Sequence, residues 1–320
     1  MARVLVTRHL PDGGLEPLVR AGHEIVQRAD DTPFTPNELT AAVAAVDAVV
    51  CLLTDRIDAT VFAAGAGRLR VVANVAVGYD NIDIPSAQAH GIAVCNTPGV
   101  LDDTTADLAF LLMLAAARLT SEAEADVRAD RWPGWGINQY LGQDVHGAAL
   151  GLVGYGRIGQ AVARRAAGFG MTVLHHTRHD TGVVGWVGDL HHLLREVDIV
   201  SLHVPLTGET RHLIGAAELA LMKPSAVLVN TARGPVVDEA ALAAALTAGT
   251  IFAAGIDVFE REPEIHPGLL AAPRTVLLPH IGSASVSTRT RMARVACTGV
   301  VAVLAGERPG NVVTAWRSRQ

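Results

Sequence analysis

The sequence predicts an α/β protein built on parallel β-sheets, and two observations support this fold class. Short apolar segments of strand length alternate with Ala-rich segments of helical period along most of the 320 residues. Such alternation is typical of parallel sheets, because each strand is followed by a crossover helix. The second observation is a glycine pattern that joins a strand to a helix at residues 149–168. A chain of this length fits one very large domain or two of ordinary size.

The first hundred residues read as one set of strands and helices. Gly and Pro separate the segments, and apolar β-branched residues favour the strands. The expected strands are residues 3–7, 23–27, 48–53, 69–75 and 92–95. The expected helices between them are residues 15–21, 37–46 and 59–66.

The remaining residues read as a connecting helix, a second set of strands and a returning helix. Thr104 and Thr105 can cap a long apolar helix over 106–119, which continues as a charged helix over 121–130 and an aromatic loop over 131–136. The next strands are expected at 149–153, 172–176, 199–204, 226–230, 253–258 and 275–278. A last helix over 286–305 ends at Gly306, and we expect it to return to the first domain.

Composition excludes several classes of protein. The formal net charge of −6 argues against nucleic acid or an anionic membrane surface as a partner. Three cysteines lie far apart without metal-ligand spacing, which favours a reducing cytoplasm. The N-terminus has no long apolar leader, and the longest apolar segment, 108–117, is too short to span a bilayer. We therefore expect a soluble cytoplasmic protein.

The glycine pattern predicts a dinucleotide site. Gly154, Gly156 and Gly159 form G-x-G-x-x-G directly after an apolar strand and at the start of a helix. The first glycine permits a tight turn, the second lets a pyrophosphate approach the backbone, and the third lets the helix pack close to the strand. The helix N-terminus, which includes Arg157 and Ile158, favours the anion.

Further motifs make the chain resemble the D-2-hydroxyacid dehydrogenases. They are Ala-Val-Gly-Tyr-Asp-Asn-Ile-Asp at 76–83, Asn-Thr-Ala-Arg-Gly-Pro-Val-Val-Asp at 230–238, Gly-Ile-Asp-Val-Phe-Glu-Arg-Glu-Pro at 255–263 and Pro-His-Ile-Gly-Ser at 279–283. The segments 52–58 and 96–108 look most like the glyoxylate/hydroxypyruvate reductase branch. The resemblance implies two Rossmann-like or flavodoxin-like domains with the active site in the cleft between them. Residues 101–285 would bind the dinucleotide, and residues 1–100 and 286–320 would form the substrate domain.

The same resemblance implies three catalytic residues. Arg233 follows a strand end, where its guanidinium can hold the carboxylate and keto oxygens of a substrate. His280 matches the general acid for reduction, a task that suits imidazole because its unperturbed pKa is near neutral. Glu262 matches the carboxylate that holds the imidazole and favours its charged form. Glu260 is the alternative, but the family places this carboxylate directly before a proline.

The resemblance also implies binding residues around these three. Val77 and Gly78 would bind the substrate carboxylate through backbone N–H groups, with Leu53 as an apolar contact. Asp257 would contact the nicotinamide carboxamide. The remaining cofactor-lining positions, together with Arg233 and His280, are Thr105, Val204, Pro205, Thr231, Ala232 and Gly282. Trp132 and Trp135 resemble aromatics at the family's homodimer contact, although a local apolar plug is an alternative.

The residues after the second strand of the glycine-turn domain predict NADP(H) as the preferred cofactor, with NAD(H) possible. An acidic residue there usually binds the ribose hydroxyls of NAD and would repel a 2′-phosphate. Here His176, Thr177 and Arg178 occupy that region, and a hydroxyl with a guanidinium suits the phosphate. Asp180 is the alternative ribose ligand if the loop is shifted. The nearby histidines lack a metal motif, so no metal is expected.

We therefore expect an enzyme that reduces glyoxylate or hydroxypyruvate to the D-2-hydroxy acid. Dehydrogenases for D-lactate, D-glycerate 3-phosphate or bulkier acids are alternatives within the family. Glu262 argues against formate dehydrogenases of this fold, which have glutamine there, and Val77 argues against phosphite dehydrogenase, which has lysine. A dinucleotide-binding corepressor is a rival from another class, but the chain keeps the whole Arg, Glu and His set.

Overall fold

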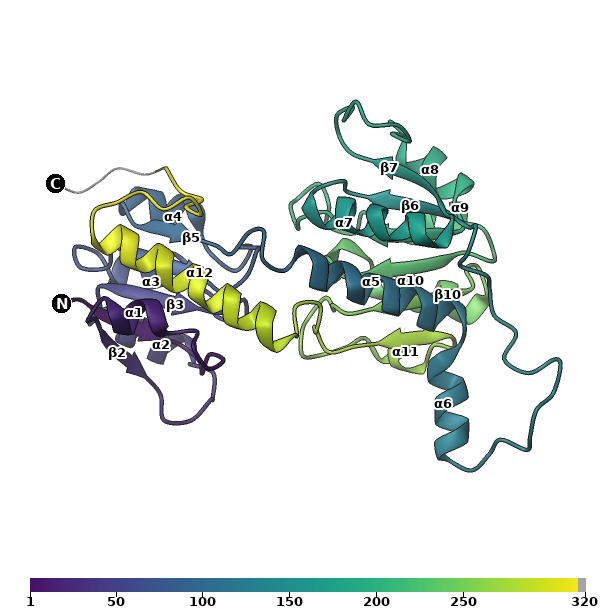
Figure 1. The fold of residues 1–320 in the computed structure, drawn as a ribbon, viewed down its shortest axis with the longest axis horizontal. Coiled ribbons are helices and arrows are strands. Elements are labelled where there is room, and N and C mark those ends of the chain that lie inside the picture. The colour runs from purple at the N-terminus through teal and green to yellow at the C-terminus, as the bar shows by residue number, and fades with distance from the viewer. Residues whose placement is uncertain (316–320) are drawn as a thin grey trace. The chain divides into compact units, whose positions relative to one another are not determined.

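The computed structural model describes residues 1–315, and these form two compact units. Unit 1 contains Met1–Leu101 and the described residues from Ser283 onward, and unit 2 contains Asp102–Gly282 (Figure 1). Each unit has one sheet, and every pair of neighbouring strands in both sheets is parallel. The predicted fold class, two parallel-sheet α/β domains, is therefore confirmed.

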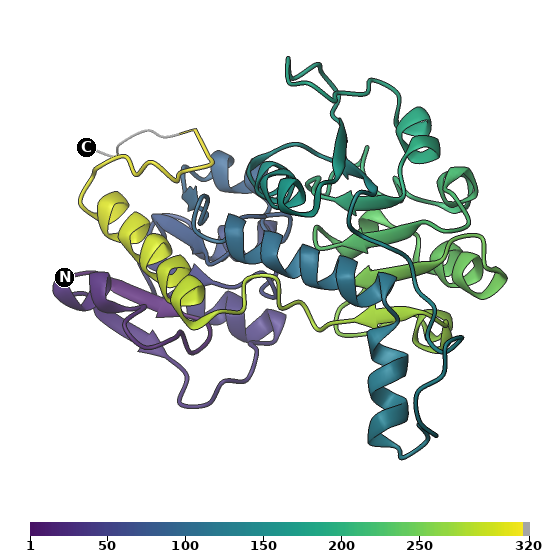
Figure 2. The ribbon, with the colours of Figure 1, turned by 45° about the vertical axis from the view of Figure 1, so that its right-hand side comes forward.

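Unit 1 has a five-stranded sheet in the order β2-β1-β3-β4-β5. Its strands are β1 (Arg3–Val6), β2 (Glu24–Gln27), β3 (Ala48–Cys51), β4 (Val71–Asn74) and β5 (Ala93–Cys95). Its helices are α1 (Glu16–Arg20), α2 (Pro36–Val43), α3 (Ala59–Ala64), α4 (Ile84–Ala89) and α12 (Val286–Leu304). Side chains from α2, α3 and α4 form one buried core with the sheet. The helix α12 packs on the strands beside α1 (Figure 2).

Unit 2 has a six-stranded sheet in the order β11-β10-β9-β8-β6-β7. Its strands are β6 (Ala149–Val153), β7 (Thr172–His176), β8 (Ile199–Leu202), β9 (Val227–Asn230), β10 (Ala253–Ile256) and β11 (Thr275–Leu277). On one face lie α5 (Asp102–Ala117) and α7 (Arg157–Ala166). The other face is covered by α8 (Leu190–Glu196), α9 (Ala216–Leu221), α10 (Glu239–Ala248) and α11 (Pro267–Ala271).

The order of strands places a switch point in each sheet. In unit 1 the chain passes outward from β1 to β2 and then returns to β3 on the other side of β1. Unit 2 repeats this pattern with β6, β7 and β8. Open parallel sheets bind ligands outside the carboxyl ends of their strands at such points. The loops after β1, β3, β6 and β8 are therefore the first places to search for a site.

Three elements differ from the sequence-based expectation. The helix expected to continue from 106–119 into 121–130 is broken, because α5 ends at Ala117 and α6 (Thr120–Arg128) begins after Leu119, which has φ +53°. The long apolar helix α5 begins at Asp102, so the prediction that Thr104 and Thr105 cap its N-terminus is wrong. Asp102 and Asp103 occupy the first turn, where negative charge stabilises the helix, and Thr105 is buried inside the helix. The short helix α4 was not expected from the sequence; Asp83 caps its first turn by accepting the Ser86 amide at 3.0 Å.

Within residues 1–315, no single helix has the length and apolar character needed to cross a membrane. In the described part of the chain, α5 and α6 (Thr120–Arg128) together have the length and apolar composition of a span, but this pair is bent by 69°. Over the same residues no cluster of three or more His, Cys, Asp or Glu side chains could hold a metal ion.

Candidate active site

The predicted site residues of unit 2 all follow the carboxyl ends of its strands or lie beside them. Gly154 follows β6, the residues 176–178 end and follow β7, and Val204 and Pro205 follow β8. Thr231, Ala232 and Arg233 follow β9, Asp257 follows β10, and His280 and Gly282 come after β11. Thr105 of α5 lies beside Gly282, because a Cβ at Gly282 would be 3.5 Å from the Thr105 methyl carbon.

The glycine turn has the geometry of a phosphate cradle. Gly154 has φ +98°, and a Cβ there would lie 2.6 Å from the carbonyl oxygen of His203 after β8. A Cβ at Gly159 would lie 2.3 Å from the Gly154 carbonyl oxygen, so α7 packs directly on the turn. At Gly156 a Cβ would meet no atom within 4 Å, and this N-cap residue gives the helix no side-chain cap. An open backbone at a helix N-terminus fits a dinucleotide pyrophosphate.

His280 and Glu262 form a hydrogen-bonded pair beyond the carboxyl ends of β10 and β11. Nδ1 of His280 lies 2.8 Å from Oε2 of Glu262, and the Glu262 Oε1 accepts the Phe259 amide at 3.0 Å. The two side chains are 25% and 30% exposed. Burial raises the pKa of Glu262, but the His280 hydrogen bond and charge, the Phe259 amide and the Arg233 charge hold that pKa below its usual value. Among residues 1–315, Nε2 of His280 has no hydrogen-bond partner.

Arg233 is held close to this pair by its own loop. Asn230 accepts from the Ala232 amide and donates to the Arg233 carbonyl, both at 3.0 Å. The following residue, Gly234, lies against the backbone of Phe259, where a Cβ would overlap the carbonyl carbon at 1.9 Å. The loop after β9 is thereby packed on the segment that leads to Glu262, and the charge of Arg233 acts on that carboxylate.

Asp257 fixes the backbone on which His280 is carried. Its carbonyl accepts the His280 amide at 2.8 Å, and its two carboxylate oxygens accept the amides of Ile281 at 2.7 Å and Gly282 at 2.8 Å. His280 has φ +55°, a conformation that non-glycine residues rarely adopt and that surrounding contacts must maintain. Burial raises the pKa of Asp257 to about 6. This role of Asp257 could not be expected from the sequence, because it depends on the positions of backbone amides.

The neighbouring glutamate has a different set of partners. Glu260 contacts His212 at 3.0 Å and accepts the Glu239 amide at 2.9 Å. Glu239 is itself buried and accepts the amides of Glu260 and His266. Of the two candidates in the motif, Glu262 is therefore the one that contacts His280.

The residues after β7 form an exposed polar turn. The Thr177 hydroxyl donates to the His179 carbonyl at 2.7 Å, and the exposed Arg178 pairs with Glu209 at 2.9 Å. His176 contacts the Val187 carbonyl at 2.9 Å. Asp180 accepts the Gly182 amide at 2.8 Å and so closes its own turn.

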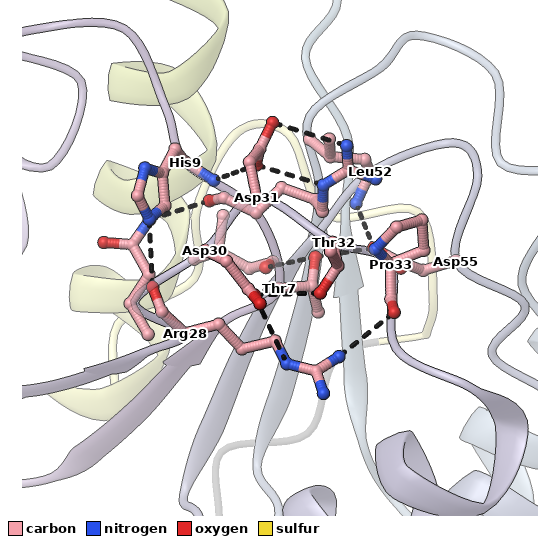
Figure 3. A network of polar contacts seen from close by, with 12 residues as sticks. Thr7, His9, Arg28, Asp30, Asp31, Thr32, Pro33, Leu52 and Asp55 are labelled. Atoms are coloured by element: carbon pink, nitrogen blue, oxygen red, sulfur yellow. Dashed lines mark hydrogen bonds and ion pairs between the residues drawn. The ribbon is translucent and has the colours of Figure 1, made fainter.

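The three predicted site residues of unit 1 lie at the carboxyl end of its sheet. Leu53 follows β3 in a loop where Asp55 accepts the Leu52 amide at 2.8 Å and the Thr7 hydroxyl at 2.5 Å (Figure 3). Val77 and Gly78 follow β4 and are partly buried. All three residues are thus carried by loops that follow central strands of the sheet.

A dinucleotide-binding sheet with an Arg, Glu and His set at its carboxyl edge defines an NAD(P)-dependent oxidoreductase. The model of the D-isomer specific 2-hydroxyacid dehydrogenase NAD-binding domain matches residues 110–282. The chain belongs to the D-isomer-specific 2-hydroxyacid dehydrogenase family, in its glyoxylate reductase branch. The resemblance found in the motifs is therefore confirmed.

Relatives match the chain over nearly its whole length. It is 50% identical to a glyoxylate reductase of Korarchaeum cryptofilum, over 97% of this chain and 95% of the relative. It is 45% identical to a glyoxylate reductase of Thermococcus litoralis, over 97% and 96% of the two chains. An NADPH-dependent glyoxylate/hydroxypyruvate reductase of Sinorhizobium meliloti, solved with NADP and malonate, has TM-score 0.87 and 35% identity over 99% of each chain.

Proposed function

We propose that this enzyme reduces glyoxylate and hydroxypyruvate to the corresponding 2-hydroxy acids, with D configuration where the product is chiral. The ion pair between Nδ1 of His280 and Glu262, at 2.8 Å, is the observation that carries the proposal. It leaves Nε2 of the imidazole without a partner among residues 1–315, beyond the carboxyl ends of the strands, where the glycine turn also lies. The names of the relatives indicate the two substrates.

The nucleotide fits unit 2 on three grounds. The glycine turn has an open backbone at Gly156, and α7 presents its N-terminus there. The Thr231 hydroxyl is buried without a hydrogen-bond partner among residues 1–315, and a buried polar group of this kind needs one. Gly154, Gly156 and Gly159, with the first turn of α7, would hold the pyrophosphate. When bound, the reduced nicotinamide supplies the hydride.

The side chains of unit 2 would carry out the remaining chemistry. Arg233 would hold the carboxylate and polarise the keto oxygen, because its planar guanidinium can donate to both. His280, oriented through Glu262, would give its Nε2 proton to the oxygen as the hydride arrives. Asp257 would keep the His280 backbone in place. Val77 and Gly78 of unit 1 would bind the carboxylate through their amides, with Leu53 as an apolar contact.

We also propose that NADP(H) is the preferred cofactor. Thr177 and Arg178 occupy the turn after β7, where an acidic residue would select NAD. Asp180 is engaged by the Gly182 amide, which argues against it as the ribose ligand. The nearby Glu209 is the present partner of Arg178, and a 2′-phosphate would compete with it for the guanidinium.

A homodimer is the assembly that the apolar surface of unit 2 supports. The helix α6 and the loop after it expose several large apolar side chains: Val127, Trp132, Trp135, Ile137 and Leu141. An exposed cluster of this kind marks an interaction surface. Sedimentation of the wild type and of Trp135→Ser tests this directly, and a monomeric wild type contradicts it.

Initial-rate oxidation of NADPH and NADH with glyoxylate, hydroxypyruvate, pyruvate and phenylpyruvate tests the proposed function. We expect the highest kcat/KM with NADPH and the two small oxygenated acids. Faster oxidation of NADH would keep the reaction but overturn the cofactor preference. No turnover with any of the four acids would overturn the reaction itself.

A further inference from the structure

Two consecutive carbonyls in the loop after β4 are held by asparagine side chains. The Val77 carbonyl accepts Nδ2 of Asn96 at 2.8 Å, and the Gly78 carbonyl accepts Nδ2 of Asn74 at 2.8 Å. Asn74 is the last residue of β4, and Asn96 directly follows β5. Both asparagines are buried, with exposed fractions of 0% and 8%. The carbonyls are therefore drawn toward the end of the sheet.

The amide groups of the same two residues are left open. Neither the Val77 nor the Gly78 N–H has an acceptor among residues 1–315. Val77 and Gly78 are partly buried, and successive open N–H groups form a natural site for an anion. Because the carbonyls of this loop are satisfied from within unit 1, its positive N–H dipoles remain available for a ligand.

Further hydrogen bonds hold the Asn74 side chain in place. Asn74 also donates to Oδ1 of Asn81 at 3.0 Å. Nδ2 of the Asn81 side chain then donates to the carbonyls of Leu52 and Asp55, at 3.1 and 2.9 Å. Asp55 in turn binds Thr7 at the end of β1 (Figure 3). The loop after β4 is thus tied to the loop after β3 by side-chain amides.

We propose that Asn74 and Asn96 are positioning residues that select carboxylate substrates by holding the Val77 and Gly78 carbonyls away from the ligand. The inference deepens the proposed function and depends on it, since it assigns the substrate carboxylate to these two amides. A carbonyl released from its asparagine is free to turn outward, where its negative end repels a carboxylate. The asparagines then act on affinity for the acid, and the chemical step depends on side chains of unit 2.

The variant Asn96→Leu tests this, because leucine has a similar size but cannot donate to the Val77 carbonyl. We expect KM for glyoxylate and Ki for oxalate to rise about tenfold, the change that one unpaired carbonyl causes. kcat at saturating glyoxylate and KM for NADPH should change less than about twofold. Asn96→Ala should raise KM less, about threefold, because water can replace the lost amide.

Gln27→Leu is the matched control. Gln27 of β2 also donates its side-chain amide to a loop carbonyl of unit 1, that of Arg8, at 2.9 Å. Loss of this hydrogen bond should lower the melting temperature. It should leave KM for glyoxylate, KM for NADPH and Ki for oxalate unchanged. A merely structural role for Asn96 would give the same result, and that result would overturn the inference.

Calorimetric titration of oxalate in the presence of NADP+ separates this inference from the proposed function. Turnover by the wild type with unchanged KM and Ki in Asn96→Leu overturns the inference alone. Oxalate binding that weakens in Asn96→Leu, in an enzyme that reduces none of the four acids, supports the inference and overturns the reaction. If the wild type neither reduces an acid nor binds oxalate, both are overturned.

Discussion

Replacing Glu262 with glutamine should slow reduction while leaving the His280 ring in place. Glutamine can still accept the Nδ1 proton of His280, so the ring keeps its orientation while the negative charge is lost. The pKa of Glu262 is held below its usual value, so the carboxylate is ionised throughout the neutral range. In this range it favours the charged imidazole, which is the form that donates the proton during reduction.

The magnitude follows from the geometry of the pair. A charge-assisted hydrogen bond contributes about 1.5–3 kcal/mol. Exposure of 25% and 30% of the two side chains places this one at the lower end of that range. A loss of about 1.4 kcal/mol corresponds to a factor of ten, so kcat/KM for glyoxylate should fall about tenfold in Glu262→Gln.

The assay is kcat/KM for glyoxylate with NADPH across the neutral range. Glu260→Gln is the matched control, because that glutamate contacts His212 and the Glu239 amide instead. Melting temperatures of both variants account for any loss of folded enzyme. An unchanged kcat/KM in Glu262→Gln, or an equal fall in Glu260→Gln, would refute the assigned role.

Three other predictions concern the cofactor, the glycine turn and the substrate. Arg178→Ala should raise KM for NADPH about tenfold and leave KM for NADH unchanged, because only NADPH carries a 2′-phosphate for the guanidinium to bind; initial rates decide this, and equal effects would contradict the preference. Gly159→Ala places a Cβ 2.3 Å from the Gly154 oxygen, so we expect a loss of about 1–3 kcal/mol in stability and weaker NADPH binding, whereas Gly168→Ala, which meets no atom within 4 Å, should melt no lower than the wild type. Arg233→Lys keeps the charge but loses the paired donors, so kcat/KM for glyoxylate should fall at least about tenfold, and an unchanged value would remove Arg233 from the site.

The parallel-sheet fold was predictable because its signals are local. Each strand is a short apolar run, and the turn at Gly154 and Gly159 needs residues without side chains, as the atoms around them show. The predicted ends of helices were less accurate where two neighbouring groups of residues both favour a helix start. Thr104 and Thr105 resemble N-caps, but Asp102 and Asp103 also favour a helix start, and the helix begins with them.

The supporting contacts of the site were beyond sequence reasoning. Asp257 accepts amides from residues 24 and 25 positions later in the chain, at 281 and 282. Asn96 reaches the carbonyl of Val77 across neighbouring strands. Such contacts depend on which strand ends become neighbours and on where backbone groups point. A single sequence supplies neither, although asparagine at successive strand ends is a signal worth testing.

The most direct test of the account is the product formed from hydroxypyruvate. With NADPH in excess, we predict one D-glycerate for each NADPH oxidised by the wild type. His280→Gln should still bind NADPH but form this product about 10²–10⁴ times more slowly, since the proton donor is lost. L-glycerate as the product, no reduction at all, or a wild-type rate in His280→Gln would contradict the account.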